Sequence, residues 1–405
     1  MNTIITPSLA KGQITAPPSK SFAHRMLIAA ALSEGKTTIH NLPKCEDVAA
    51  TMDCLKALGA GIEVSGENAS ITGVCKEFFS NSEIFRVKES GSTLRFLIPL
   101  LATDSKARRI IREGSLIERS IEVYEDLFAK KDVLIENCKE NILVRGPISA
   151  GKYYIPGNVS SQFVSGLLMA LPLMDGESEL ILTSGVESSS YIDMTIRVLS
   201  DFGVKIIRES KYHMIIPGGQ IYSAHSATVE GDHSSCAYMQ ALNLLGGEVV
   251  CNGLSDDSLQ PDAICTELFA KLKSGGSEID ISDCPDLGPI LFAIAAALKG
   301  AVFTGIHRLR LKESDRISAM ASELRKFGVD ITVSDNSVYV PKSSLVRPRE
   351  VLYSHNDHRI AMALAILATV VGGEISDSEV VAKSYPEFWN DLRALGIKID
   401  FTHRN

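Results

Sequence analysis

Basic and hydroxyl side chains stand immediately before strongly apolar segments at several places in this 405-residue chain. In the first of them, residues 19–25, Lys20 and Arg25 precede an apolar run that predicts a buried helix. The free N–H groups and the positive dipole end of a helix N-terminus attract anions, and an arginine can bind a carboxylate or a phosphate through two parallel hydrogen bonds. This segment therefore favours anion binding, although a capped helix with exposed basic residues would show the same pattern.

Three further segments repeat this pattern of small polar residues followed by an apolar run, at residues 89–95, 157–163 and 231–235. In the first of these, Gly91 would let a ligand approach the backbone closely. One such helix start is common, whereas four of them predict helix N-termini that converge on an anion-binding cleft. The glycine and lysine spacing of a P-loop is absent, so the pattern does not indicate nucleotide binding.

The C-terminal half adds acids to the cations. Asp286 precedes the apolar helix expected from Ile290, and it would act either as a helix cap or as a base directed into a cleft. Residues 310–316 place five charges in seven positions. Such a cluster is typical of a solvated helix start with ion pairs, and it is also compatible with a cationic site that contains one acid.

Two more segments in this half carry candidate ligands. Asp357 and His358 have the chemistry of metal ligands, but no third ligand stands at a plausible spacing. Arg359, at the start of an apolar helix, is better interpreted as a clamp for an anion. Lys383 lies among aromatic and apolar residues, where it would belong either to the edge of the core or to a site.

The overall composition is that of a globular protein, with 45% hydrophobic and 22% charged residues. A net charge of −8 argues against a protein that binds nucleic acid by neutralising phosphates, yet it allows a local basic pocket. The longest apolar run, residues 290–298, is too short to span a membrane, and the first residues do not resemble a signal peptide. The eight cysteines lack zinc-site spacing and suit reduced core thiols, so we expect a cytoplasmic protein.

A repeated pattern of a helix end, a glycine and a β-rich run is the main sign of the fold. It is found at Gly59, Gly203, Gly328 and Gly396, and weaker copies begin at Leu127 and Leu268. A glycine just past a helix accepts the left-handed conformation that ends it, and alternating residues after it indicate a half-buried strand. A period of roughly 60 to 70 residues suits a small αβ unit. Six units then predict two domains of three, although the same connection is common in unrelated αβ proteins.

The length of the chain also favours two domains. The best candidate crossings between them are Pro17–Pro18 and the polar stretch 223–232. We therefore predict a first domain of residues 14–226 and a second domain of residues 1–13 plus 227–405. The N-terminal strand would belong to the second domain, and the active site would lie in the cleft between the two.

In their order along the chain, these segments resemble the enolpyruvyl transferase family, and within it the branch that acts on shikimate 3-phosphate. The motifs are Pro-Ser-Lys-Ser with His-Arg, Gly-Ser-Thr with Arg, Ser-Ser-Gln, Tyr-Ile-Asp, Gly-Asp with Ser-Ser, Pro-Asp, Lys-Glu-Ser-Asp-Arg, Asp-His-Arg and Lys-Ser-Tyr-Pro. Each motif is weak alone, but the ordered set spans nearly the whole chain. The resemblance implies an α/β fold, the two-domain inside-out α/β barrel, with three similar αβ units in each domain.

The resemblance also implies a reaction. This branch moves the enolpyruvyl group of phosphoenolpyruvate to the 5-hydroxyl of shikimate 3-phosphate and releases phosphate, a step of the shikimate pathway of aromatic amino-acid biosynthesis. The addition–elimination passes through a tetrahedral intermediate and uses no metal and no organic cofactor. The expected partners are therefore the two small-molecule substrates, with no nucleic acid and no membrane, and we expect a monomer.

Each substrate carries a phosphate and a carboxylate, so several cations must converge on it. For phosphoenolpyruvate the resemblance implies Lys20, Gly91, Arg119, Gln162, Arg316, Arg359 and Lys383. For shikimate 3-phosphate it implies Lys20, Ser21, Arg25, Ser160, Ser161, Gln162, Ser188, Tyr191, Asp286 and Lys312. For catalysis it implies Lys20, Asp286, Lys312 and Glu313. Glu313 is the candidate for the proton on carbon, and either Asp286 or Lys312 is the candidate for the hydroxyl proton.

Two positions near the donor residues depart from the family pattern. Glu89 stands where the family usually has Asn, and Ser120 follows Arg119 where Pro is usual. A carboxylate beside an anion site is unexpected. Glu89 therefore either points away from the site or tunes the binding of phosphoenolpyruvate.

Two other functions are compatible with the same scaffold. The UDP-N-acetylglucosamine enolpyruvyl transferase shares the fold and the donor, but it relies on a reactive Cys or Asp in a mobile loop, and residues 108–118 contain no Cys. The second alternative is a non-catalytic protein that only binds anions. An assay with both acceptors separates the first, and substitution of Glu313 separates the second.

Overall fold

The computed structural model describes residues 1–74, 82–185 and 188–402. The chain forms two compact units: the internal unit, Pro18–Glu230, and the terminal unit, which joins Met1–Pro17 to Gly231–Asn405. The chain crosses between the two units at two places, and each crossing lies four residues after the boundary expected from the sequence. The reason is that β2 (Lys11–Thr15) still pairs within the terminal unit and β16 (Ser226–Thr228) within the internal unit.

In the described part of the internal unit, three four-stranded sheets share one pattern of pairing. The first two strands of each sheet are parallel and the other neighbours are antiparallel. In sheet order the strands are β16, β4 (Lys36–His40), β6 (Asn68–Thr72) and β5 (Gly61–Ser65); β7 (Ile84–Lys88), β8 (Arg108–Arg112), β10 (Asn141–Arg145) and β9 (Leu134–Cys138); and β11 (Lys152–Ile155), β12 (Ser178–Leu182), β14 (His213–Ile216) and β13 (Ile207–Ser210). A short parallel pair joins β3 (Ser33–Glu34) to β15 (Tyr222–Ser223).

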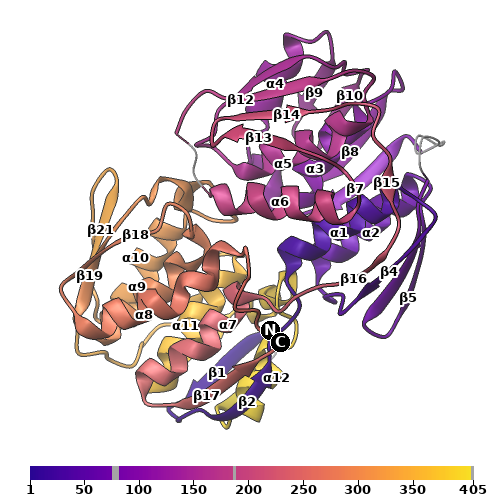
Figure 1. Ribbon diagram of the computed structural model, residues 1–405. Coiled ribbons are helices and arrows are strands. Elements are labelled where there is room, and N and C mark those ends of the chain that lie inside the picture. The colour runs from indigo at the N-terminus through magenta and orange to yellow at the C-terminus, as the bar shows by residue number, and fades with distance from the viewer. Residues whose placement is uncertain (75–81, 186–187, 403–405) are drawn as a thin grey trace. The chain divides into compact units, whose positions relative to one another are not determined.

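The helices in the described part of the internal unit are α1 (Lys20–Leu32), α2 (Glu46–Ala57), α3 (Gly91–Leu101), α4 (Glu122–Ala129), α5 (Ser161–Ala170) and α6 (Ser189–Asp201). They differ in how much of their surface is buried. α1, α3 and α5 are apolar on nearly every side and almost completely buried, whereas α2, α4 and α6 bury one face. The buried helices pack against one another or against the one-faced helices, so the interior is helical and the sheets lie around it (Figure 1).

The described part of the terminal unit repeats this design with two complete sheets and one short one. The complete sheets are β18 (Ser277–Asp280), β19 (Gly300–Thr304), β21 (Ser337–Pro341) and β20 (Thr332–Val333); and β22 (Leu352–Tyr353), β23 (Gly373–Ser376), β1 (Asn2–Thr6) and β24 (Lys398–Thr402). The short sheet is the parallel pair of β2 and β17 (Glu248–Asn252). The helices are α7 (His233–Ala241), α8 (Cys265–Ser274), α9 (Gly288–Ala297), α10 (Arg316–Lys326), α11 (His358–Val371) and α12 (Phe388–Ala394). Of these, α7, α9 and α11 are the nearly fully buried ones.

The predicted glycine pattern is confirmed at its four strong copies. Gly59, Gly203, Gly328 and Gly396 have φ angles of 108°, 79°, 81° and 91°. Each follows a helix (α2, α6, α10 or α12) and precedes the last strand of a sheet (β5, β13, β20 or β24). Glycine is favoured there because a Cβ would strain the left-handed backbone.

The two weaker copies differ from the strong ones. After α4 the left-handed residue is Asp132, with φ 56°, in place of a glycine. After α8, Gly275 and Gly276 lead into β18, which is the first strand of the following sheet instead of the last strand of its own. The sixth unit therefore consists of β2, α7, β17 and α8, without the antiparallel strand pair that completes the other five.

Each unit has its own hydrophobic core, made of residues from that unit alone. The cysteines in the described part of the chain are free thiols, and Cys75 lies outside it. Among the described residues, no helix combines the length and the apolar character that crossing a membrane requires.

Gly396 tests the helix–glycine–strand pattern. An added Cβ would meet only Leu9 O, at 3.8 Å, so crowding contributes little. We expect Gly396→Ala to lower the free energy of unfolding of the terminal unit by about 1–2 kcal/mol, because an L-residue is strained in the left-handed region. Gly396→Asn should lose less, since asparagine tolerates this conformation better.

Urea unfolding measures both variants through the fluorescence of Trp389, the one tryptophan of the chain, which is buried in α12 of the same unit. Equal losses for alanine and asparagine would show that the backbone conformation at residue 396 is not what limits stability there.

Candidate active site

The predicted site residues of the internal unit lie at the N-termini of its helices. Lys20 is the first residue of α1, Gly91 of α3 and Ser161 of α5. Ser160 caps α5, and Ser188 precedes α6 in a left-handed conformation with φ 55°. We call the following residues the internal cluster: Lys20, Ser21, Arg25, Gly91, Arg95, Arg119, Ser160, Ser161, Gln162, Ser188 and Tyr191.

Arg25 is a buried cation whose partners are neutral. Its guanidinium donates to Thr195 Oγ1 at 2.8 Å, to the Ser21 and Tyr191 carbonyl oxygens at 2.7 and 3.2 Å, and to Ser165 Oγ at 3.4 Å. Burial lowers the pKa of Arg25 to about 10. The side chain is thus held in place by uncharged acceptors, which leave its positive charge for an anion.

Lys20 is oriented by an acid that the sequence did not single out. Its Nζ lies 2.9 Å from Oδ2 of Asp47, in the first turn of α2, and both side chains are mostly buried. The two residues are far apart in the sequence, so their pairing follows from the packing of α1 against α2.

Gly91 and Arg119 are in direct contact. A Cβ on residue 91 would lie 2.6 Å from a guanidinium nitrogen of Arg119, so only glycine leaves room for this approach. Glu89 accepts hydrogen bonds from the Ser115 backbone N–H at 3.2 Å and from the Ser115 hydroxyl at 3.1 Å. Ser115 belongs to η2 (Gly114–Glu118), which leads into Arg119. Glu89 therefore anchors the segment that carries Arg119.

Gln162 links α5 to α3. Its Nε2 donates to Ser92 Oγ at 2.9 Å, and its Oε1 accepts from Arg95 at 2.8 Å. Arg95 also donates to the carbonyl of Ser120 at 3.3 Å, and the Ser120 hydroxyl accepts from the N–H of Glu122 at the start of α4. Ser120, where the family usually has Pro, thus satisfies the first N–H of α4, whose cap residue is Ile121. Arg95 and Ser92 lay inside the predicted segment 89–95, but they were not among the predicted ligands.

A second group of charged residues surrounds Asp286 in the terminal unit. Asp286 lies in η6 (Pro285–Leu287). Its Oδ1 accepts from Arg316 at 2.8 Å and lies 3.1 Å from Lys312 Nζ, while its Oδ2 accepts from Arg359 at 3.0 Å. Burial alone would raise the pKa of Asp286, but Arg359, Lys312 and Arg316 together lower it well below its usual range. The carboxylate is therefore ionised at neutral pH.

Arg316, the first residue of α10, is almost inaccessible to solvent and contacts three carboxylates. Besides Asp286 these are Glu313 at 2.7 Å and Asp357 at 2.8 Å. Burial alone would lower the pKa of Arg316, but Asp357, Glu313 and Asp286 raise it above its ordinary value.

Asp357 is fully buried and caps α11 by accepting from the Arg359 N–H at 2.9 Å. The metal-ligand hypothesis for Asp357 and His358 finds no support in this arrangement. No group of three His, Cys, Asp or Glu side chains that could hold a metal occurs in the part of the chain that the structure describes.

Two lysines complete the group. Burial lowers the pKa of Lys312 to about 8, against the opposing effect of Asp286. Lys383, at the end of η8 (Ser378–Lys383), donates to the carbonyl of Asn356 at 3.0 Å and to its Oδ1 at 2.9 Å. Asn356 is another partner that the sequence did not single out. We call this set the terminal cluster: Asp286, Lys312, Glu313, Arg316, Asp357, Arg359 and Lys383.

The predicted anion site at residues 231–235 has a different character. Asp232 caps α7 by accepting from the Ser235 N–H at 2.7 Å, and the Ser234 hydroxyl donates to the buried carboxyl of Asp262. Burial, with the nearby charge of Asp286, raises the pKa of Asp262 to about 7. Acidic groups thus occupy this helix start, which disfavours an anion there.

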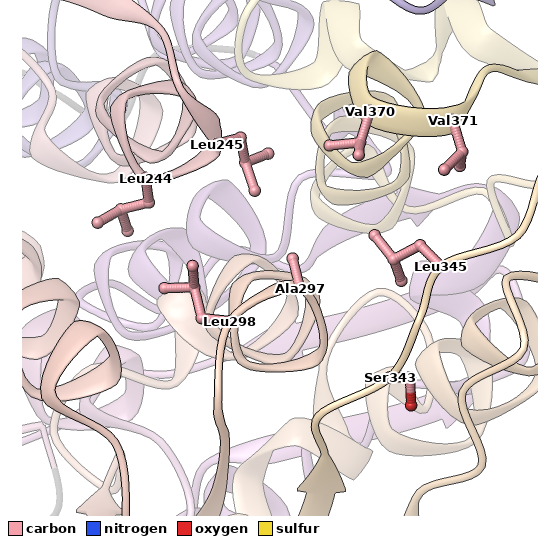
Figure 2. A pocket seen from close by; sticks show the side chains of 8 residues that line it. All are labelled: Leu244, Leu245, Ala297, Leu298, Ser343, Leu345, Val370 and Val371. Carbon is pink, nitrogen blue, oxygen red and sulfur yellow. The ribbon is translucent and has the colours of Figure 1, made fainter.

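A separate cavity of about 350 Å³ lies in the terminal unit, at the C-terminal ends of α9 and α11 (Figure 2). It is lined by Leu244, Leu245, Ala297, Leu298, Ser343, Leu345, Val370 and Val371. These side chains carry no charge, so the cavity does not have the chemistry that a phosphate or carboxylate needs. The two charged clusters are therefore the candidate active-site residues.

Every residue that the family resemblance implies as a ligand or catalyst belongs to one of these two clusters, whereas residues 231–235 belong to neither. The internal cluster combines helix N-termini with Lys20, Arg25 and Arg119, which suits the binding of phosphate and carboxylate groups. The terminal cluster combines cations with Glu313 and Lys312, whose types allow proton transfer. Residues of both kinds, anion ligands and proton carriers, are what a reaction between two phosphorylated acids requires.

Comparison with known proteins places this arrangement in a family. The family description EPSP synthase (3-phosphoshikimate 1-carboxyvinyltransferase) matches residues 5–392. A 3-phosphoshikimate 1-carboxyvinyltransferase of Clostridium kluyveri is 39% identical over 417 residues, covering 98% of this chain and 97% of the relative. A protein of the same name from Clostridium perfringens is 38% identical, covering 97% and 98%.

Solved structures give the fold independently. An EPSP synthase from Acinetobacter baumannii superposes with a TM-score of 0.81 at 24% identity, over 98% of this chain and 99% of that chain. The predicted two-domain inside-out α/β fold is thereby confirmed. Because the family match also spans both charged clusters, the chain belongs to the EPSP synthase family.

Proposed function

We propose that this protein transfers the enolpyruvyl group of phosphoenolpyruvate to the 5-hydroxyl of shikimate 3-phosphate, giving 5-enolpyruvylshikimate 3-phosphate and phosphate. The observation that carries the proposal is the excess of cations in the internal cluster, where the acceptors of the buried Arg25 among the described residues are uncharged. Such a cation suits a doubly anionic substrate. Membership of the EPSP synthase family supports the identity of the two substrates.

The assignment of ligands follows the clusters. We assign shikimate 3-phosphate to Lys20, Ser21, Arg25, Ser160, Ser161, Gln162, Ser188, Tyr191, Asp286 and Lys312. We assign phosphoenolpyruvate to Lys20, Gly91, Arg119, Gln162, Arg316, Arg359 and Lys383. The contact of Arg119 with Gly91 and the hydrogen bond between Gln162 and Ser92 support a shared anion site at the start of α3.

The reaction is an addition followed by an elimination. In the addition, a carbon–oxygen bond forms between the 5-hydroxyl and the enol carbon, the hydroxyl loses its proton and the methylene carbon gains one. In the elimination, the former methylene carbon loses a proton, and the bond between the neighbouring carbon and the phosphate oxygen breaks. Positioning and charge stabilisation by the clusters supply most of the remaining acceleration.

Two residues of the terminal cluster are assigned to the proton transfers, and a third orients the hydroxyl. Glu313, partly exposed and oriented by Arg316, is assigned to the methylene carbon. Lys312, with a pKa of about 8, is assigned to the hydroxyl proton, because a group that titrates near neutral pH transfers protons best. Asp286 stays ionised and orients the hydroxyl, since its lowered pKa makes it a weak base.

Two expectations from the sequence stay predictions: a monomeric state and a cytoplasmic location. The free thiols of the described cysteines suit a reducing compartment. Sedimentation of the purified chain and fractionation of the source cells would test them.

The first test is an assay of phosphate release. With phosphoenolpyruvate, the enzyme should release phosphate when shikimate 3-phosphate is added and none when UDP-N-acetylglucosamine is added. The reverse preference would assign the chain to the other enolpyruvyl transferase. Release with neither acceptor, while both anions still bind, would favour a binding protein.

Glu313→Gln tests the carbon proton. The amide keeps the shape and an oxygen for Arg316, but it does not transfer a proton, so we expect kcat to fall by roughly a hundred- to ten-thousandfold. Binding of shikimate 3-phosphate, measured by calorimetry, should persist. The matched control is Asp330→Asn, an acid near the other end of α10 whose ion pair with Arg325 is exposed. Normal turnover by the Glu313 variant would remove this residue from the mechanism.

The pH dependence of kcat/KM tests Lys312. If its neutral form accepts the hydroxyl proton, kcat/KM must rise as the pH increases through about 8, the pKa of this group in the free enzyme. Lys312→Arg stays protonated, so the rise of kcat/KM with pH should disappear, along with most of the activity. A fall in kcat/KM through the same range would mean that Lys312 acts as a cation, and it would return the role of base to Asp286.

A further inference from the structure

A four-residue turn, Ser354–Asp357, precedes α11 and is conformationally strained. The Asp357 N–H donates to the Ser354 carbonyl at 2.9 Å, and the two residues between them, His355 and Asn356, have φ angles of 52° and 54°. Two left-handed central residues define a type I′ turn, in which glycine, asparagine and aspartate are favoured. A histidine in this position persists when surrounding contacts hold it there.

The turn positions cations of the terminal cluster. Both the carbonyl oxygen and Oδ1 of Asn356 accept from Lys383 Nζ, at 3.0 and 2.9 Å. The next residue, Asp357, accepts from Arg316 Nε at 2.8 Å and from the Arg359 N–H at 2.9 Å. A change in the turn would therefore displace Lys383, because two of its acceptors belong to one left-handed residue.

A buried acid contacts the turn and the residue before it. Glu323, on α10, is 1% exposed, and its Oε1 lies 3.0 Å from His355 Nε2. Its Oε2 accepts from the Tyr353 N–H at 2.9 Å and from Lys326 Nζ at 2.8 Å. Burial alone would raise the pKa of Glu323, but the hydrogen bonds from His355, Lys326 and Tyr353 lower it. The carboxylate thus ties α10 to the residues that lead into the turn.

We propose that Glu323 and His355 are positioning residues for phosphoenolpyruvate, because their contact holds the left-handed turn that places Lys383. The inference rests on the proposed function in one respect, the assignment of Lys383 to this substrate. His355 contacts Glu323 and Ser322, so it acts through the backbone of the turn. The helix that carries Glu323, α10, begins at Arg316. Its first residue thus belongs to the terminal cluster, and a residue of its last turn contacts the turn that precedes α11.

Two substitutions of His355 separate the turn from the imidazole. His355→Ala removes the contact with Glu323 and leaves a residue that resists the left-handed conformation. We expect the KM for phosphoenolpyruvate to rise roughly five- to thirtyfold, the ratio that matches about 1–2 kcal/mol of lost left-handed preference. His355→Asn also removes the imidazole but favours the turn, so it should recover most of the affinity. The KM for shikimate 3-phosphate should stay within about twofold for both variants, a difference too small to reflect a lost contact.

The matched control is Gly396→Ala, which strains a left-handed residue of the same unit away from the cluster and should leave both KM values unchanged. Glu323→Gln should reproduce the effect of His355→Ala, and the double variant should cost no more than the larger single one, because both act through one contact. Additive losses would overturn the shared contact.

The reactivity of Lys383 gives a readout that does not depend on turnover. Brief acetylation followed by peptide mass spectrometry should show faster labelling of Lys383 in His355→Ala than in the wild type, with Lys271, an exposed lysine of α8, unchanged. If labelling changes while the wild type lacks transferase activity, the positioning stands and the proposed function fails. Unchanged labelling, or equal losses in the alanine and asparagine variants, would overturn the positioning itself.

Discussion

The burial of Arg316 is the constraint on which the terminal cluster depends. A guanidinium removed from water is tolerated when carboxylates and hydrogen bonds compensate its lost hydration. Here the compensation comes from η6 through Asp286, from the segment before α10 through Glu313, and from the cap of α11 through Asp357. Removal of one partner from such a buried group typically costs about 3–5 kcal/mol. The three segments are therefore fixed relative to one another by a single charge. Lys312 and Arg359 contact one of the same carboxylates, that of Asp286.

Arg25 in the internal unit is also a buried guanidinium, but uncharged groups compensate its lost hydration. It is as deeply buried, but its partners are hydroxyl and carbonyl oxygens, so burial lowers its pKa while the acids around Arg316 raise that of Arg316. Neutral acceptors orient a guanidinium without cancelling its charge. The internal cluster thus retains a positive charge that a phosphate or carboxylate can neutralise, whereas in the terminal cluster carboxylates already neutralise most of the charge. The first arrangement favours binding of an anion, and the second favours fixed geometry around Lys312 and Glu313, whose side chains are of types that can transfer protons.

Local features of the chain were predictable from sequence, whereas pairings between distant segments were not. The left-handed glycines Gly59 and Gly396 follow from one helix end and one strand start, and both are present as expected. The direction of Glu89 was left open because it depends on η2, which folds back to present Ser115. The partner of Lys20 could not be named because Asp47 reaches it only through helix packing. The short sixth unit was not predicted because Gly275 follows a helix as the pattern requires, but the strand after it, β18, pairs in the next sheet.

The three carboxylates around Arg316 have distinct capacities, which limits the chemistry of the site. An ionised carboxylate accepts about four hydrogen bonds. Asp357, fully buried, already accepts from Arg316 through two nitrogens, from the Ser314 hydroxyl and from the Arg359 N–H. It has no capacity left for a metal ion, a substrate hydroxyl or a proton on carbon. Asp286 and Glu313 are 17% and 20% exposed and can reach a ligand. Under the proposed function the proton transfers would therefore fall to Glu313 and Lys312, and Asp357 keeps Arg316 in place.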